Sequence, residues 1–140
     1  ENIARYLGVA VEEIGSLSQQ SQNPEKVSSI CAVLAETDVI NMVSRGIATP
    51  DILKGIHLSM ASRIVKLLKV TGIKTGTVLL TGGLALDSGL LAAIQEEMVA
   101  EKVNVKTVSH PDSIYAGAIG AALWGAFRYG KLQELETAAA

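Results

Sequence analysis

The spacing of hydrophobic residues predicts a chain of helices with two short strands near its end. Recurrence every three or four positions predicts helices over 1–21, 36–44, 49–70, 88–100 and 114–129. An apolar run at 77–81, typical of a buried strand, and a second segment at 103–108 predict two strands. Because a helix separates these strands, we expect a parallel, covered sheet. Two strands do not make a stable sheet alone, so strands from another part or another chain are expected to complete it.

Capping residues mark the ends of these helices. Thr49 is the expected N-cap of the long central helix, with Pro50 at its first position and Asp51 in its first turn. Asp87 or Ser88 is expected to cap the helix after the first strand. The first helix is expected to break near Gly15. Six apolar residues form the expected buried face of the central helix: Ile52, Ile56, Met60, Ile64, Leu67 and Leu68.

The step from the first strand to the next helix carries the strongest indication of a ligand. Thr81-Gly82-Gly83 places two glycines where the chain leaves the strand, so bare backbone can approach adenosine or phosphate. The positive end of the helix near Ser88 favours an anion there. The alternative is an ordinary strand–helix loop that needs glycine for its backbone angles. No Gly-Lys-Ser/Thr follows, so this is not a Walker loop.

The last helix is rich in small residues. Gly117 and Gly120 favour close packing of this helix against a neighbour, and the alternative is a helix against a moving neighbour or hinge. The apolar stretch 114–127 is shorter than the roughly 18 residues of a membrane span, which predicts a buried helix in a soluble protein.

The remaining candidates are isolated. Cys31 is interpreted most simply as a small core residue, since one thiolate does not hold a metal cluster alone. Glu36 and Asp38 are interpreted as the charged first turn of a helix, and His57 as a surface or packed histidine. His110 follows the second strand at the edge where parallel sheets bind ligands, which makes it a weak site candidate. The sequence pattern shows no Ser-His-Asp arrangement.

Composition narrows the function classes. The 140 residues fit one domain or part of one, and 49% are hydrophobic, enough for a core. The net charge of −2 and the lack of a basic stripe argue against nucleic-acid binding. The single cysteine excludes an internal disulfide and fits a reducing, cytoplasmic setting. The chain opens directly in a helix without a cap, so we expect it to be cut from a longer protein.

Three landmarks in this order carry a resemblance to a known family. The segment SICAVLAETDVI at 29–40 resembles a cysteine motif of the BadF/BadG/BcrA/BcrD ATPases, which activate 2-hydroxyacyl-CoA dehydratases and drive benzoyl-CoA reductases. The Gly82-Gly83 turn and the helix with Gly117 and Gly120 follow as they do in that family. The segment HPDSIYAGAIGAALW at 110–124 is especially similar to the ATPase subunits of benzoyl-CoA reductases.

The resemblance implies an α/β fold, the C-terminal lobe of an actin/sugar-kinase/Hsp70-like ATPase, over residues 1–132, with a frayed tail at 133–140. It implies ATP or ADP with Mg as ligand and a [4Fe-4S] cluster shared between subunits. Thr81, Gly82, Gly83 and Leu84, with Gly117, are then the nucleotide-binding residues. Cys31 matches the second of the two cluster cysteines that each subunit supplies.

The implied function is ATP-dependent electron activation. A sister ATPase subunit and the subunits of a reductase or dehydratase are the implied partners, without nucleic acid or membrane. The first lobe of the family, its phosphate loops and its first cluster cysteine are absent, so we expect no ATP hydrolysis by this chain alone. Two alternatives stay open: a lobe of a non-redox, sugar-kinase-like ATPase, in which Cys31 is merely buried, and a non-catalytic scaffold that forms a subunit interface.

Overall fold

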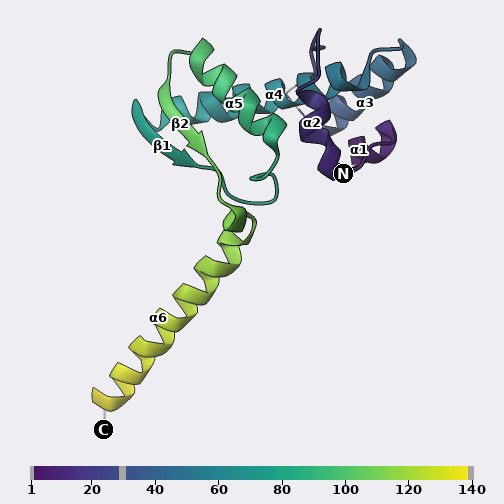
Figure 1. Ribbon diagram of the computed structural model, residues 1–140. Coiled ribbons are helices and arrows are strands. Elements are labelled where there is room, and N and C mark those ends of the chain that lie inside the picture. Colours follow the sequence, from purple (N-terminus) through teal and green to yellow (C-terminus); the bar gives the residue numbers. More distant parts are fainter. Residues whose placement is uncertain (1, 29–30, 139–140) are drawn as a thin grey trace. The chain divides into compact units, whose positions relative to one another are not determined.

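The computed structural model describes residues 2–28 and 31–138. The elements are α1 (Asn2–Leu7), η1 (Val11–Glu13), α2 (Ile14–Ser18), α3 (Ala32–Ser44), α4 (Thr49–Val70), β1 (Thr75–Leu79), α5 (Ser88–Ala100), β2 (Asn104–Val108), η2 (Pro111–Tyr115) and α6 (Ala116–Ala138) (Figure 1). Residue 1, expected to open the first helix, and residues 139–140 of the expected tail lie outside the described part, as do residues 29–30.

The chain divides into two compact units. Residues 1–79 and 87–108 form the first unit, which holds α1 to α5 and both strands. Residues 80–86 and 109–140 form the second unit, which holds the turn after β1, η2 and α6.

The first predicted helix is broken at a different glycine from the one expected. α1 ends at Leu7, and Gly8 follows with a φ of +69°, a left-handed conformation that glycine adopts without strain. Gly15 lies inside α2 and is buried instead. A Cβ atom on Gly15 would lie 2.7 Å from Ser88 Oγ, so this glycine lets α2 approach α5 closely.

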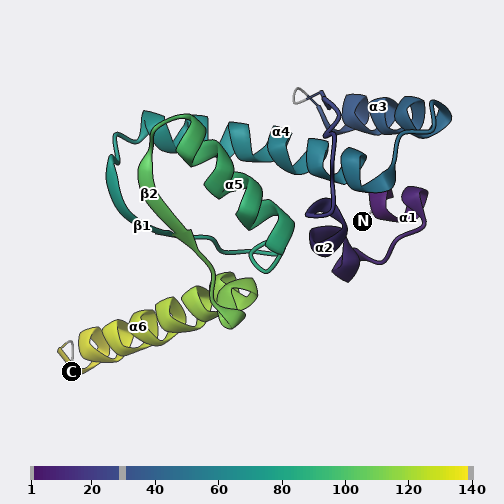
Figure 2. The ribbon, with the colours of Figure 1, turned by 45° about the horizontal axis from the view of Figure 1, so that its top comes forward.

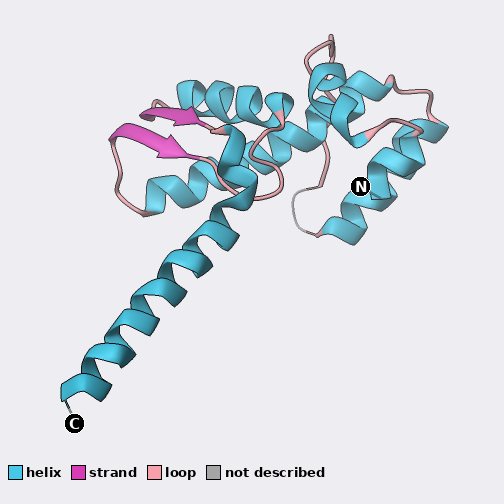
Figure 3. Cartoon of the chain, turned by 60° about the horizontal axis from the view of Figure 1, so that its bottom comes forward, coloured by secondary structure: helices cyan, strands magenta, loops and turns pink. Residues whose placement is uncertain are grey.

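The strands pair as predicted, but the sheet is less covered than expected. β1 and β2 are parallel, with Thr75 opposite Asn104 and Leu79 opposite Val108, and their arrows run the same way in Figure 3. Both begin slightly off the predicted bounds. Most of β1 is exposed, so the prediction of a buried first strand is wrong for this chain. Only two strands form the sheet in the described residues, so no neighbour strand covers the outer edge of β1.

The helices of the first unit pack on one another and on the sheet. α5 contacts both α4 and β2, and α2 contacts both α4 and α5 (Figure 2). An apolar cluster joins α3 to the start of α4 through Val39, Met42 and Ile52. α3 begins at Ala32, earlier than the predicted 36, because Cys31 is extended and serves as its N-cap residue.

The long helix α4 has the predicted length, but its cap and buried face differ. Ala48 is the N-cap residue, so Thr49 is already helical and the predicted Thr49 cap is wrong by one position. The deeply buried row is Leu53, His57, Ala61 and Val65, together with Ile52. Of the six predicted core positions, only Ile52 is fully buried, and Leu67 is 69% exposed. Two neighbouring rows are apolar, and the packing of α5 and α2 selects the row that contains His57.

The last helix is longer and more exposed than predicted. α6 runs to Ala138, beyond the expected end at 129 and through most of the segment expected to fray. None of its residues is buried, and Trp124 is 61% exposed although its ring stacks on Phe127 at 5.5 Å. The prediction of a buried helix is therefore wrong for this chain. Within residues 2–28 and 31–138, no helix has both the length and the apolarity to cross a membrane.

Gly55 lies where the backbone at Glu25 passes closest to α4, so a substitution at Gly55 tests the packing of the first unit. A Cβ atom at this position would overlap the carbonyl oxygen of Glu25, which crosses α4 there. We expect Gly55→Ala to lower the free energy of unfolding by about 1–3 kcal/mol, as overpacking does in tight cores. Urea denaturation measures the change. Gly120→Ala is the matched control, because a Cβ there meets nothing within 4 Å, and equal stabilities of the two variants would contradict the prediction.

Candidate functional site

The predicted ligand turn is an open backbone segment in the second unit. Residues 81–84, called the glycine turn here, are all exposed. Gly82 has a φ of +95°, which explains one of its two glycines by backbone conformation alone. Its N–H donates to the carbonyl of Ser113 at 3.0 Å, and its carbonyl accepts from the N–H of Ala85 at 3.0 Å. The turn is thus tied to η2, the element that begins after His110.

Gly83 needs another explanation, because its φ lies outside the left-handed range. A Cβ atom at Gly82 or Gly83 would meet nothing within 4 Å. The space beside these two glycines is therefore open toward solvent. A backbone without side chains next to open space is what the ligand interpretation requires, while backbone conformation explains only Gly82.

The two glycines of the last helix have no neighbour in the described structure either. A Cβ atom at Gly117 or Gly120 would meet nothing within 4 Å. The close packing that the sequence favours is therefore not formed within the described residues. Gly117 belongs to the same unit as the glycine turn, and its face of α6 is open.

His110 forms hydrogen bonds within the turn that follows β2. Its Nδ1 accepts from the N–H of Asp112 at 3.1 Å, and its backbone N–H donates to Ser113 Oγ at 2.9 Å, which makes His110 the N-cap residue of η2. Its side chain is 66% exposed. His110 therefore shapes the turn that holds Gly82.

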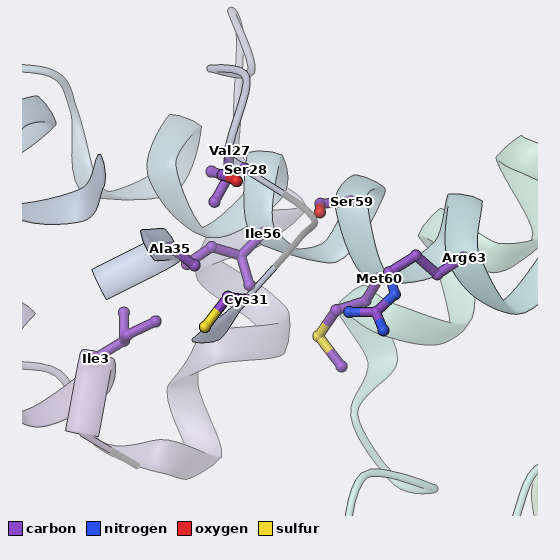
Figure 4. Close-up of a pocket in the computed structure, with 9 residues that line it drawn as sticks. All are labelled: Ile3, Val27, Ser28, Cys31, Ala35, Ile56, Ser59, Met60 and Arg63. Carbon is purple, nitrogen blue, oxygen red and sulfur yellow. The ribbon is translucent and has the colours of Figure 1, made fainter. Parts of the chain in front are cut away.

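Cys31 lies on a pocket in the first unit, not in the core. The thiol is exposed, so the interpretation of Cys31 as a small core residue is wrong for this chain. It borders a pocket of about 230 Å³, mostly apolar, between α1, α3 and α4 (Figure 4). Nine residues line the pocket: Ile3, Val27, Ser28, Cys31, Ala35, Ile56, Ser59, Met60 and Arg63. Among the described residues, no group of three or more His, Cys, Asp or Glu is arranged to hold a metal ion.

The two acidic residues after Cys31 differ in role. Asp38 Oδ2 accepts from the backbone N–H of Ser28 at 2.8 Å, so this carboxylate ties the segment before Cys31 to α3. Glu36 is exposed and does not border the Cys31 pocket. Because α3 begins at Ala32, neither residue lies in its first turn, so the first-turn interpretation is wrong for both. Asp38 instead makes a contact ten positions back along the chain.

The structure also assembles a Ser-His-Asp arrangement that the sequence pattern did not reveal. His57 Nδ1 lies 2.8 Å from Ser18 Oγ, and its Nε2 lies 3.3 Å from Asp87 Oδ2. His57 is 4% exposed and Ser18 0%. A hydroxyl without solvent access cannot attack a substrate, so this trio joins helices and is not a catalytic triad. The signal in the sequence was the spacing of four between Leu53, His57 and Ala61, which places His57 on a buried row.

Asp87 connects this trio to α5. Its Oδ1 accepts from the N–H groups of Gly89 and Leu90, which confirms the predicted N-cap. Burial raises the pKa of Asp87, but the hydrogen bond from His57 and those from the two N–H groups outweigh it, so the pKa lies below its usual value. The ionised form of Asp87 is thus favoured by folding.

Comparison with solved structures defines the class of protein. The chain superimposes on component A of the (R)-2-hydroxyglutaryl-CoA dehydratase of Acidaminococcus fermentans with a TM-score of 0.74 and 37% identity, over 87% of this chain and 45% of that one. It superimposes equally well, at 0.74 and 35% identity, on the activator of the 2-hydroxyisocaproyl-CoA dehydratase of Clostridium difficile with bound ADPNP, over 96% and 48%. The fold is that of the actin-like ATPase activators of dehydratases, which confirms the predicted class.

The chain belongs to the BadF/BadG/BcrA/BcrD ATPase family, which it matches over residues 1–125. It is 69% identical to a benzoyl-CoA reductase subunit of Thauera aromatica over 96% of its own length and 48% of that protein. It is 37% identical to the 2-hydroxyisocaproyl-CoA dehydratase activator of Clostridioides difficile over 87% and 44%. The chain therefore spans about half the length of the curated relatives that it matches.

The depressed pKa of Asp87 predicts an acid-dependent stability. A carboxylate whose pKa is lower in the folded state stabilises the fold above its unfolded pKa of about 3.9, and this contribution is lost as pH falls through the folded value. We expect Asp87→Ala to lower the free energy of unfolding by about 1–2 kcal/mol at pH 7, because the N-cap is lost. Denaturation at pH 7, 5, 4 and 3 measures the difference, which should shrink below about pH 4. A difference that is constant with pH would contradict this explanation.

Proposed function

We propose that this chain is part of an ATP-dependent electron activator that serves a benzoyl-CoA reductase or a 2-hydroxyacyl-CoA dehydratase. The observation that carries the proposal is the 69% identity to the benzoyl-CoA reductase subunit of Thauera aromatica over nearly the whole chain. The activity belongs to a longer assembly, because the chain covers only about half of such relatives. By itself the chain is expected to bind nucleotide without hydrolysing it.

The proposed nucleotide site is the glycine turn, with Thr81, Gly82, Gly83 and Leu84, supported by Gly117. Open space beside both turn glycines leaves the backbone free for an adenosine to pack on it. The ADPNP bound to the activator from Clostridium difficile supports an adenine nucleotide as the ligand class. Mg²⁺ is expected to accompany the phosphates and to neutralise their charge, with ligands from outside the glycine turn, which offers no carboxylate.

The proposed cluster ligand is Cys31. An exposed thiol at the start of a 13-residue helix suits a negatively charged iron–sulfur group, because the N-terminal end of a helix carries partial positive charge. A [4Fe-4S] cluster needs about four thiolates, and this chain offers one. The donor set is therefore incomplete in this chain, and the other ligands must come from other parts of the assembly. When bound, the cluster supplies the low-potential electron.

The proposed partners are a sister ATPase subunit and the subunits of the reductase or dehydratase. A shared cluster requires a second subunit, and the exposed apolar residues of α6 and the open edge of β1 are compatible with burial in a larger protein. We propose that the assembly works in the cytoplasm, in accord with the single free cysteine. The exposure of Cys31 on a pocket favours this function over a non-redox ATPase in which the thiol is buried.

Titration of ADP into the isotope-labelled chain, followed by NMR, tests the nucleotide site. Amide shifts should centre on the glycine turn and on residues 109–113. Gly83→Leu should abolish them, because a side chain there fills the open space without strain on the fold. Gly125→Leu is the matched control in the same unit, since a Cβ at that position also meets nothing within 4 Å. Equal shifts in Gly83→Leu and the parent chain would show that the glycine turn does not hold the nucleotide.

The role of Cys31 is tested in a protein that joins this chain to the length of the relatives that it does not cover. Reconstitution with iron and sulfide should yield about four irons per dimer and a [4Fe-4S] EPR signal after reduction. Cys31→Ser should remove most of this iron and the signal. Normal ADP binding in the same variant shows that the protein is folded. Full iron content in Cys31→Ser would show that Cys31 is not a cluster ligand, whereas absence of iron from the parent protein would favour the non-redox alternative.

A further inference from the structure

Ser113 is the buried residue of η2, although the residues on both sides of it face solvent. It is 3% exposed, while residues 110–112 and 114–115 are all exposed. Among the described residues of the second unit, it is the only polar side chain that is buried. A buried hydroxyl costs stability unless it finds a hydrogen-bond partner, so its partners indicate what it holds in place.

The side chain and the N–H of Ser113 both bond back to His110. Ser113 Oγ accepts from the backbone N–H of His110 at 2.9 Å, and the N–H of Ser113 donates to the carbonyl of His110 at 2.8 Å. The hydroxyl thereby satisfies the N–H of the N-cap residue, as the third residue of a capping box does. These two reciprocal hydrogen bonds close residues 110–113 into one turn.

The carbonyl of Ser113 joins this turn to the glycine turn within the same unit. It accepts from the N–H of Gly82 at 3.0 Å and also from the N–H of Ala116, the first residue of α6. The carbonyl of Gly82 accepts in turn from the N–H of Ala85, which is fully buried. Both backbone groups of Gly82 therefore have a partner, and one of these partners is set by η2.

The direction of the Ser113 carbonyl depends on the turn that the hydroxyl closes. A carbonyl keeps its direction only while the peptide groups beside it keep theirs, and the bond from His110 to Ser113 Oγ is one of the two that fix residues 110–113. We propose that Ser113 is a positioning residue for the glycine turn: its hydroxyl fixes η2, and η2 presents the carbonyl that holds Gly82.

This role rests on the nucleotide site proposed above, and it names the side chain that keeps this site ordered. A turn that is already ordered loses less conformational entropy when a ligand binds to it. The hydroxyl of Ser113 therefore favours nucleotide binding through Gly82, with no contact to the nucleotide required.

Hydrogen exchange of the whole chain without nucleotide tests this contact. The readout is the amide of Gly82, whose acceptor is the Ser113 carbonyl. Ser113→Ala should speed its exchange by about three- to tenfold, the effect expected when one hydrogen bond that orders the acceptor is lost. Thr137→Ala is the matched control, because it also removes a hydroxyl of the second unit, one that donates to the carbonyl of Gln133 at 2.8 Å. Unchanged exchange in Ser113→Ala, or equal acceleration in both variants, overturns the inference.

A measurement on the parent chain remains decisive if Ser113→Ala does not fold. NMR detects the scalar coupling across the hydrogen bond between the ¹⁵N of Gly82 and the carbonyl ¹³C of Ser113. This coupling should be present in the free chain and should persist when the chain is saturated with ADP. Its absence from the free chain, or its loss on ADP binding, overturns the inference, because the bound turn would then not be the one that η2 holds.

ADP titration of the same variants separates this inference from the proposed function. Ser113→Ala should weaken ADP binding by about three- to tenfold, in proportion to the loss of order at Gly82. Ser113→Thr, which keeps the hydroxyl, should restore most of the affinity, and Thr137→Ala should bind as the parent chain does. Equal ADP affinities of Ser113→Ala and the parent chain overturn the role of Ser113, whereas absence of ADP shifts in the parent chain overturns the nucleotide site itself.

Discussion

The close approach of α5 to α4 around a buried histidine is the contact on which the first unit depends. Gly89 has no side chain where the His57 ring lies, and Asp87 and Ser18 take up both ring nitrogens. Because each polar partner would be costly to bury alone, only one register of the helices satisfies all three. Apolar packing is less directional than this, so the trio supplies much of the geometric definition of the junction.

A different face of α4 lines the pocket beside Cys31. Ile56, Met60 and Arg63 line the pocket that Cys31 borders (Figure 4). His57 and Ala61 belong to the buried row of the same helix. One continuous 22-residue helix therefore carries both the wall of the proposed cluster-ligand pocket and the anchor of α5.

Local chemistry predicted much of the fold. The strands and the Asp87 cap were readable because each depends on residues a few positions apart. The parallel pairing was readable because a helix lies between the two strands in the sequence. The family, too, was readable from three landmarks in order, and the match to the family over residues 1–125 confirms it. The errors at Gly8 and Thr49 are of another kind. They shift an element end by a few residues, because several nearby residues can serve as a break or a cap.

What the sequence by itself determined is the set of elements, their order and the family, all of which follow from short-range periodicity and spacing. Only the tertiary structure decided which row of α4 is buried, that His57 is a core residue between Ser18 and Asp87, and that Cys31 is exposed. The reason is that burial is set by the partner surface. Two adjacent rows of α4 are apolar enough to be buried, and the glycines of α2 and α5, distant in sequence, select between them.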